Sequence, residues 1–315
     1  MKNRFICFLM MIFMGLNAYC KDKIKVVAPD GLPALSLVKM INEKPEIDGV
    51  EVDYKIEKLS ETLVMTLMKK EADLAIVPSN LAGQLYNKGL GYKIAGTVGW
   101  GSFYVISREN LDSLKYLKGK EVTTIGKGLT PDIIFQTLLK KNGLDLKKDI
   151  KIEYLSGGNE LAPLYLAGKK DIIVIAEPVA SKILAKDKKS NADIELNNEW
   201  KNIFNTKKGY PQSTLVVSEA VLKENPEFLA KFIENLKDSI SFIESDSSKK
   251  LDYITKANVT VPKDIIDKAV KKANFDFTTG AEGKSEYMIY FKEIAENNKK
   301  AIGGKVPDEK IFQTE

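Results

Sequence analysis

Polar residues and glycines follow several short apolar runs in this sequence, and these positions are where binding chemistry is expected. Gly31 lets the backbone turn sharply after the run IKVVA, and Pro33 suits the first turn of a following helix. The free N–H groups of such a helix start can hold an anion or another polar group. The pair Ser79-Asn80 has a second interpretation as a helix cap. The candidate ligand-binding residues in the first half of the chain are Asp30, Gly31, Leu32, Ser79 and Asn80.

The stretch GKGLTPD, residues 126–132, has the composition of an anion-binding turn. Two glycines free the backbone, Thr130 is placed to cap the helix that Pro131 opens, and Lys127 lies nearby. We therefore predict that Lys127, Gly128 and Thr130 contact a phosphate, sulfonate or carboxylate group. The stretch lacks the third glycine of a dinucleotide fingerprint and the Gly-Lys-Ser/Thr of a P-loop. An ordinary capped helix is the alternative.

Further positions could contribute polar or aromatic contacts to a ligand. Glu177 ends the apolar run IIVIA, so it could receive a cationic or hydrogen-bond-donating group, or else cap the next helix. Trp100, between two glycines, could form a flat wall for a ligand or pack at a hinge. Gly158 and Asn159 form a flexible helix entry that could also touch the ligand.

Signatures of an enzyme are scarce in the sequence. The chain contains no histidine, which excludes Ser-His-Asp and Cys-His catalytic groups and every histidine metal site. It has two cysteines, no Gly-x-Ser-x-Gly elbow, and no pair of acidic residues placed by spacing alone. No basic block with interleaved aromatic residues supports binding of nucleic acid. We therefore expect a binding protein with no catalytic residues, no metal and no cofactor.

The elements that would position these residues occur twice in the same order. The first series runs strand, helix, strand, helix and strand, from IKVVA to ADLAIVP, and the second runs from EVTTI to DIIVIAEP. Pro33 and Pro131 are 98 residues apart, as are Asp73 and Asp171. Strands that alternate with helices of this length predict βαβ units with parallel strands. The repeat therefore predicts two α/β lobes built on one plan.

Two segments are placed to carry the chain between the lobes. YKIAGTVGWGSFYVISR joins the two series, and an extended run from Gln212 to Ser218 follows the second. Lobe 1 is predicted at residues 21–103 and 213–315, with helices after Asn225, and lobe 2 at 104–212. Because ligands bind beyond the carboxyl ends of parallel strands, the candidate loops of both lobes should border one cleft.

The first twenty residues have the outline of a secretory signal peptide. Lys2 and Arg4 precede an apolar run, and small and polar residues follow it. Residues 1–20 are therefore assigned as a signal peptide, whose removal would lower the net charge from +5 to +3. Cys20 is a candidate for lipidation because the residues before it resemble a loose lipobox, while ordinary cleavage or an uncleaved anchor are the alternatives. We expect the mature chain outside the cytoplasmic membrane, periplasmic or lipid-anchored at the outer face of a membrane.

Several stretches of the chain resemble the solute-binding proteins of ABC importers. They include VVAPDGLPALSLVKM, ADLAIVPSNLAG, IGKGLTPDIIFQTLLKKNGLD, LAPLYLAGKKDIIVIAEP and IGGKVPD. The group it resembles most is the nitrate/sulfonate/taurine type, which also includes binders of thiamine-pyrimidine and riboflavin precursors. The resemblance implies an α/β protein with the two-lobed type II periplasmic-binding-protein fold. In that fold each lobe is a mixed, mostly parallel sheet flanked by helices.

The same resemblance implies how the protein works. Two crossing strands join the lobes, which close over one ligand and deliver it to a membrane permease powered by an ATPase. The family's contact roles carry over to Asp30, Gly31, Ser79, Asn80, Thr130 and Glu177.

The chemistry of the ligand follows from the residues rather than from the resemblance. Helix starts in lobe 2 favour an acceptor-rich group, whereas Asp30 and Glu177 favour a donor. We therefore predict a small polar or zwitterionic ligand, either an amino-sulfonate or a heterocycle that stacks on Trp100. The protein is expected to be a monomer. The alternatives are an enzyme on the same two-lobed fold and a surface adhesion protein that binds no small molecule.

Overall fold

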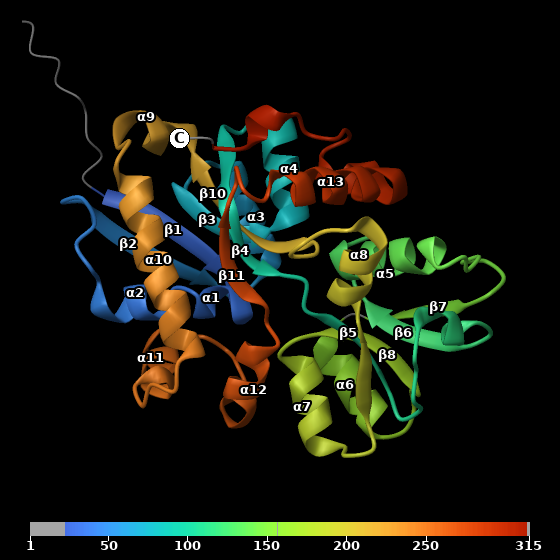
Figure 1. Ribbon diagram of the computed structural model, residues 1–315. Coiled ribbons are helices and arrows are strands. Elements are labelled where there is room, and N and C mark those ends of the chain that lie inside the picture. Colours follow the sequence, from blue (N-terminus) through green and yellow to red (C-terminus); the bar gives the residue numbers. More distant parts are fainter. Residues whose placement is uncertain (1–22, 156, 314–315) are drawn as a thin grey trace, which may run out of the picture.

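Two β-sheets, each covered by helices, form the two halves of the protein in the computed structural model (Figure 1). The structure describes residues 23–155 and 157–313, so the predicted signal peptide and Cys20 lie outside the described residues. We call the half built on the first sheet lobe 1. In spatial order, its strands are β11 (Phe275–Thr279), β4 (Tyr92–Trp100), β10 (Pro211–Ser218), β3 (Leu74–Pro78), β1 (Lys23–Pro29) and β2 (Glu51–Glu57).

The second sheet, which forms lobe 2, repeats the plan of the first. In spatial order, its strands are β7 (Lys151–Leu155), β6 (Glu121–Ile125), β8 (Ile172–Ala176), β5 (Phe103–Ser107) and β9 (Asn191–Glu195). β6 pairs in parallel with β7 and β8, just as β1 pairs in parallel with β2 and β3. In each sheet, the first three strands of the series therefore lie side by side in the order second, first, third, with the second strand at the edge, which confirms the predicted repeat.

Both sheets are mixed, because one antiparallel strand follows the parallel trio in each. β10 runs antiparallel to β3 and β4, and β5 runs antiparallel to β8 and β9. β11 runs antiparallel to β4 at the edge of the first sheet. Four of the six described strands in lobe 1 and four of the five in lobe 2 therefore point in one direction, as the mostly parallel prediction requires.

Amphipathic helices cover the faces of the two sheets. The longest shows the pattern plainly, because Phe228, Phe232, Leu236 and Ile240 recur every four residues and are buried. The helices of lobe 1 are α1 (Leu32–Leu35), α2 (Val38–Glu43), α3 (Ser60–Met68), α4 (Ser79–Asn87), α9 (Glu219–Glu224), α10 (Phe228–Glu244), α11 (Lys250–Lys256), α12 (Ile266–Lys271) and α13 (Lys284–Asn298). Those of lobe 2 are α5 (Thr130–Lys141), α6 (Gly158–Leu166), α7 (Val179–Lys186) and α8 (Leu196–Phe204). The 3₁₀ turns are η1 (Leu114–Leu117), η2 (Lys263–Ile265), η3 (Lys299–Ile302) and η4 (Glu309–Ile311).

The chain passes between the sheets twice. Gly101 and Ser102 separate β4 from β5 and form the first crossing, and the second crossing leads into β10. Phe103 lies in the second sheet and Gln212 in the first, although the predicted boundaries placed each in the opposite lobe. A Cβ atom on Gly101 would lie 2.2 Å from Cζ of Tyr210, so glycine lets the ring of Tyr210 pack against the crossing.

β11 is an element that the sequence pattern does not predict. The chain after Asn225 shows helical spacing, and the five residues FDFTT lie between two helical stretches. In the fold they pair with β4, with Phe275 opposite Gly99 and Thr278 opposite Thr97. A short edge strand of this kind is determined by its partner, because strand propensity depends strongly on tertiary context.

Side chains of both lobes meet where α13 contacts α5 and α8. Trp200 on α8 is fully buried, and its ring lies 6.5 Å from that of Tyr290 on α13. Trp200 therefore has a packing role at the contact between the lobes. Lys141 on α5 forms an ion pair of 3.1 Å with Glu293 on α13. α13 therefore extends from lobe 1 onto lobe 2 (Figure 1).

Candidate functional site

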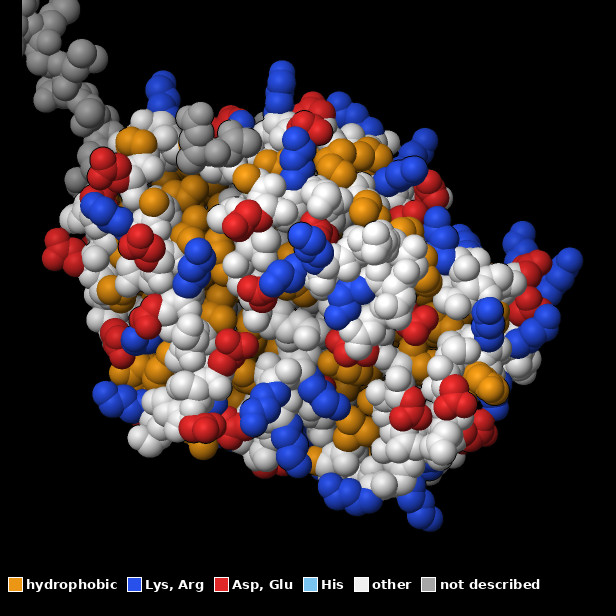
Figure 2. Space-filling model, viewed as in Figure 1, with side chains coloured by type: hydrophobic (Ala, Val, Ile, Leu, Met, Phe, Trp, Pro, Cys, Tyr) orange, Lys and Arg blue, Asp and Glu red, His pale blue; other side chains and the backbone are white. Residues whose placement is uncertain are grey.

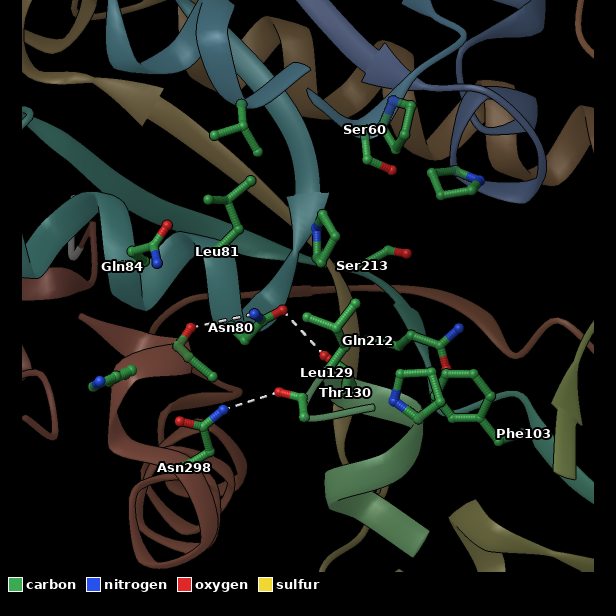
Figure 3. A pocket seen from close by; sticks show the side chains of 18 residues that line it. Ser60, Asn80, Leu81, Gln84, Phe103, Leu129, Thr130, Gln212, Ser213 and Asn298 are labelled. Atoms are coloured by element: carbon green, nitrogen blue, oxygen red, sulfur yellow. Dashed lines mark hydrogen bonds between the residues drawn. The ribbon is translucent and has the colours of Figure 1, made fainter. Parts of the chain in front are cut away.

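A cavity of about 570 Å³ lies between the two lobes and takes its walls from both of them (Figure 3). We call it the larger cavity. Pro29 and Pro78 end strands β1 and β3 of lobe 1, and the turn that precedes α5 borders the cavity from lobe 2. The predicted ligand residues that line it are Asn80, Gly128 and Thr130.

Asn80 and Thr130 join the two lobes at this cavity. Thr130 Oγ1 donates to Asn80 Oδ1 at 3.0 Å, and Asn80 Nδ2 donates to the carbonyl of Ala301 at 3.2 Å. The prediction that Thr130 caps α5 is wrong, because Leu129 holds the N-cap position and no side chain bonds there. The Thr130 hydroxyl reaches the opposite lobe instead (Figure 3).

The turn before α5 has the backbone that its glycines predict. Gly126 and Gly128 have φ angles of 68° and 74°, in the left-handed region that favours glycine. The N–H of Gly128 donates to Asp132 Oδ2 at 2.7 Å, and its carbonyl accepts from Asn298 Nδ2 at 3.0 Å. Asp132 therefore occupies one of the N–H groups that the anion-binding hypothesis assigns to a ligand.

The walls of the larger cavity are mainly apolar. The loop before α5 and the helices α3 and α4 supply most of this surface, together with the first strand of lobe 2. The main apolar contributors are Pro33, Val64, Leu81, Phe103 and Leu129. A cavity of this size and character suits an organic molecule with an apolar body.

A few polar side chains around the larger cavity are available to a ligand. Within the described structure, the side chains of Ser60, Gln84, Ser213 and Lys300 line the cavity and form no hydrogen bond. Lys300 is the one charged side chain among the described lining residues. These groups could fix the orientation of a polar end of the ligand.

Ser79 points into lobe 1 rather than toward a cavity. It is fully buried, and its hydroxyl lies 2.7 Å from Thr214 Oγ1. Thr214 in turn bonds the Tyr287 hydroxyl at 2.6 Å, to which Thr97 Oγ1 donates at 3.0 Å. This chain of hydroxyl groups links α4, β10, β4 and α13, so the position of Ser79 indicates a structural role.

A smaller cavity of about 200 Å³ adjoins the larger one, with which it shares Pro33, Gln212 and Ser213. The loop that follows β1 thus faces both cavities. The predicted ligand residues that line the smaller cavity are Asp30, Gly31, Leu32, Trp100 and Glu177.

Asp30 is engaged by residues of its own lobe. Its Oδ1 accepts the Thr260 N–H at 2.8 Å, and its Oδ2 pairs with Lys58 Nζ at 3.0 Å. Burial disfavours the charged form, but the hydrogen bonds from Thr260 and Lys58 outweigh it, so the pKa of Asp30 lies below its usual value. Asp30 is therefore an ionised group at the edge of the smaller cavity.

The side chain of Glu177 makes helix-capping contacts, which is the alternative role that the sequence predicts for it. Its Oε2 accepts the N–H of Ser181 at 3.1 Å, and its Oε1 accepts the Ser181 hydroxyl at 3.0 Å. Burial raises the pKa of Glu177 above its usual value, against the effect of the Ser181 hydrogen bonds and of nearby Lys272. The carboxylate still borders the smaller cavity.

Trp100 lies at the back of the smaller cavity, where only 2% of its surface is exposed. Its Nε1 donates to the carbonyl of Asp276 at 3.2 Å, which ties β4 to β11. Lys127, Gly158 and Asn159 line neither cavity in the described structure. Lys127 instead holds its Nζ 5.3 Å from the ring centre of Tyr154.

Several residues at the larger cavity were not predicted from the sequence. Ser60 follows β2 as Ser79 follows β3, so the same rule of loops after strands could have found it. Gln212 lies near the start of strand β10, which a rule about loops after strands does not cover. Asn298 and Lys300 come from the end of the chain, and no local pattern connects them with the cleft.

The described residues provide neither a cluster of metal ligands nor a helix that could span a membrane. No group of three or more Cys, Asp or Glu side chains is arranged to hold a metal ion. No described helix combines the length and the apolar character needed to span a bilayer.

Comparisons with solved structures agree with the architecture described above. An ABC transporter from Parabacteroides distasonis superposes with a TM-score of 0.80 at 24% identity, over 93% of this chain and 99% of that one. The periplasmic aliphatic sulphonate binding protein SsuA from Escherichia coli gives a TM-score of 0.74 at 12% identity, over 94% and 92%. At these identities the similarity concerns the fold, and it confirms the predicted two-lobed type II periplasmic-binding-protein fold.

Sequence comparisons identify the family. YtlA of Bacillus subtilis (strain 168) is 22% identical over 234 residues, which are 71% of this chain and 67% of that protein. The family described as NMT1/THI5 like matches residues 46–248. The resemblance to solute-binding proteins of the nitrate/sulfonate/taurine type is therefore confirmed. Since the matched segment is more than half of the chain, this protein belongs to the NMT1/THI5-like family.

Proposed function

We propose that this protein is an extracytoplasmic solute-binding protein that holds a small organic molecule between its lobes and delivers it to an ABC importer. The observation that carries the proposal is the larger cavity, whose walls come from both lobes. A ligand that touches both lobes favours their closed arrangement by its higher affinity for that arrangement. Delivery to a permease and ATPase is inferred from the family and from the named roles of the structural relatives.

The proposed ligand has an apolar body and polar ends. The apolar walls favour it by roughly 25 cal/mol for each Å² of apolar surface that they bury. An acceptor-rich end would lie near Lys300, and a donor group would point to Asp30 and Glu177 in the smaller cavity. An amino-sulfonate or a heterocycle satisfies both ends, whereas nitrate or sulfate would leave the apolar walls without a partner.

Mass spectrometry of the protein purified without denaturation tests the proposal directly. We expect a small organic molecule in the folded protein that is released on unfolding. Calorimetric titrations with that molecule, with taurine and with inorganic sulfate then rank the ligand classes. Tight binding of sulfate together with weak binding of every organic compound would refute the proposed ligand, whereas the absence of any small-molecule ligand would refute the function.

Val64 offers a test of where the ligand binds. Val64→Asn places an amide in the apolar wall formed by α3, so we expect the Kd of the ligand to rise several-fold. Val306→Asn changes an exposed valine away from both cavities and serves as the matched control. Equal affinities in the two variants would place the ligand outside the larger cavity.

The rival function is an enzyme on the same two-lobed fold. The purified protein should return its bound molecule unchanged after long incubation, because the chain has no histidine and no recognisable catalytic group. Formation of a product from that molecule, followed by mass spectrometry, would favour the enzyme instead.

A further inference from the structure

A groove of about 240 Å³ lies where α7 of lobe 2 meets α12 of lobe 1, and none of its lining residues lines the two central cavities. Residues of α7 form one wall, and lysines at the end of α12 form the other. The lining residues are Ser181, Leu184, Ala185, Lys268, Lys271 and Lys272. The groove thus spans the boundary between the lobes.

Lysines gather on α7 and around α12, and those around α12 line the groove itself. In Figure 2, Lys and Arg side chains gather on the lower face where Figure 1 places α7 and α12. Within the described structure none of these six lysines forms a salt bridge, and we call them the basic seam: Lys182, Lys186, Lys263, Lys268, Lys271 and Lys272.

The carboxylates in the same segments do not cancel this charge. Asp187 pairs with Arg108 at 2.7 Å, and Asp267 pairs with Lys250 at 2.6 Å. Glu177 is buried and bonded to Ser181, and of the six lysines its charge interacts with Lys272. Asp264 is the remaining acid of residues 177–187 and 263–272, which hold six lysines. Bringing α7 and α12 together therefore sets like charges against each other.

We propose that the basic seam is a second ligand site, which binds a multivalent oxyanion of the phosphate type and thereby holds α7 and α12 together. Two or more negative charges on one small ion would relieve the repulsion between the lysines of α7 and those around α12. Lysine ammonium groups bind phosphate as point charges, and a groove of about 240 Å³ has room for such an ion.

Because the basic seam lies at the boundary between the lobes, an anion bound there would also affect ligand binding in the central cleft. An anion that bridges α7 and α12 favours the arrangement in which the lobes touch, so it raises the affinity for a ligand that favours the same arrangement. This coupling rests on the proposed function, whereas binding of the anion itself does not.

Calorimetric titration with inorganic phosphate, at an ionic strength held constant with sodium chloride, tests the site. We expect saturable binding that Lys268→Gln/Lys271→Gln weakens at least tenfold. The matched control is Lys147→Gln/Lys223→Gln, which also removes two exposed lysines that form no salt bridge within the described residues, and which should change the Kd less than twofold. All of these side chains are exposed, so the variants should melt at nearly the wild-type temperature.

Further measurements separate this site from the central cleft and identify the source of the anion. Lys300→Gln should leave phosphate binding unchanged, and a loss of binding in Lys300→Gln but not in the seam variant would overturn the proposal. Sedimentation with phosphatidylglycerol vesicles, against phosphatidylcholine vesicles, tests a lipid headgroup as the source. Binding of free phosphate or of the anionic vesicles that depends on Lys268 and Lys271 supports the proposal, and failure of both refutes it.

Discussion

At the scale of single residues, Thr130 is the side chain that connects the turn before α5 with the opposite lobe. Thr130→Val keeps the shape of the side chain but removes the bond to Asn80 Oδ1. We expect the free energy of unfolding to fall by about 1 kcal/mol and ligand affinity to fall with it. Urea unfolding and ligand titration measure the two effects.

Thr255→Val is the control for this change. Its hydroxyl is exposed and donates only to the carbonyl of Leu251, one turn earlier in α11. Ligand affinity should stay at the wild-type value in Thr255→Val. If both threonine variants bind the ligand equally well, the contact between Thr130 and Asn80 does not shape the site.

Asp30 makes the stability of lobe 1 depend on pH in the acid range. Because its pKa is lower in the folded protein than in the unfolded chain, its contribution is fully present above the unfolded value near 3.8. That contribution is lost as the pH falls through the folded value. Asp30→Asn should therefore lower the free energy of unfolding by about 1 kcal/mol at pH 7 and by progressively less below about pH 4.

Urea unfolding of the wild type and of Asp30→Asn between pH 7 and pH 2.5 measures this difference. Asp112→Asn replaces an exposed carboxylate that forms no salt bridge in the described structure, so it should show no such trend. A difference between wild type and Asp30→Asn that grows toward low pH would contradict the assigned pKa shift.

Part of the site could be predicted from residue type and position. Ligands bind beyond the carboxyl ends of parallel strands, and this rule predicted a place at the cleft for residues that follow such strands. Four of them line one cavity or the other: Asp30, Asn80, Thr130 and Glu177. For Glu177, the sequence allowed both a ligand contact and a cap on the next helix, and spacing alone could not decide between them. The bond from Thr130 to Asn80 could not be predicted, because it depends on how the two lobes lie against each other.

At the scale of elements, the crossing between β4 and β5 depends on a close approach. Gly101→Ala would place a Cβ atom 2.2 Å from Tyr210 Cζ, so the ring must move, and we expect a loss of about 1–3 kcal/mol in the free energy of unfolding. Gly99→Ala is the matched control, because its Cβ would meet Ser213 at an ordinary 3.7 Å. Thermal unfolding should separate the two, and equal stability would show that Tyr210 does not pack tightly against the crossing.

The repeated elements were predictable because each series carries its own apolar runs and turns. IKVVA and EVTTI begin series with the same strand order, which the two sheets realise. The elements of the last ninety residues or so were harder, because β11 and η3 acquire their places from distant partners. β11 pairs with β4, and η3 packs on α4, so neither is specified by its own sequence.

At the scale of the whole molecule, the two lobes should move closer to each other when the ligand binds. Small-angle scattering should show a smaller radius of gyration at saturation, because a ligand in the larger cavity draws both walls inward. Inorganic chloride at the same ionic strength is the control. An unchanged scattering curve with a bound, saturating ligand would contradict capture by closure.

The strands of the second sheet lie, in sequence, between the early and the late strands of the first sheet. This affects the order in which the lobes can fold when the chain is synthesised, or passes through a membrane, from its N-terminus. All five described strands of the second sheet have emerged once the chain reaches Glu195, at the end of β9. At that point the first sheet still lacks β10 and also β11, which ends at Thr279. Lobe 2 can therefore fold while lobe 1 is still an unfinished set of parallel strands, and the part that begins the chain is the last to be completed.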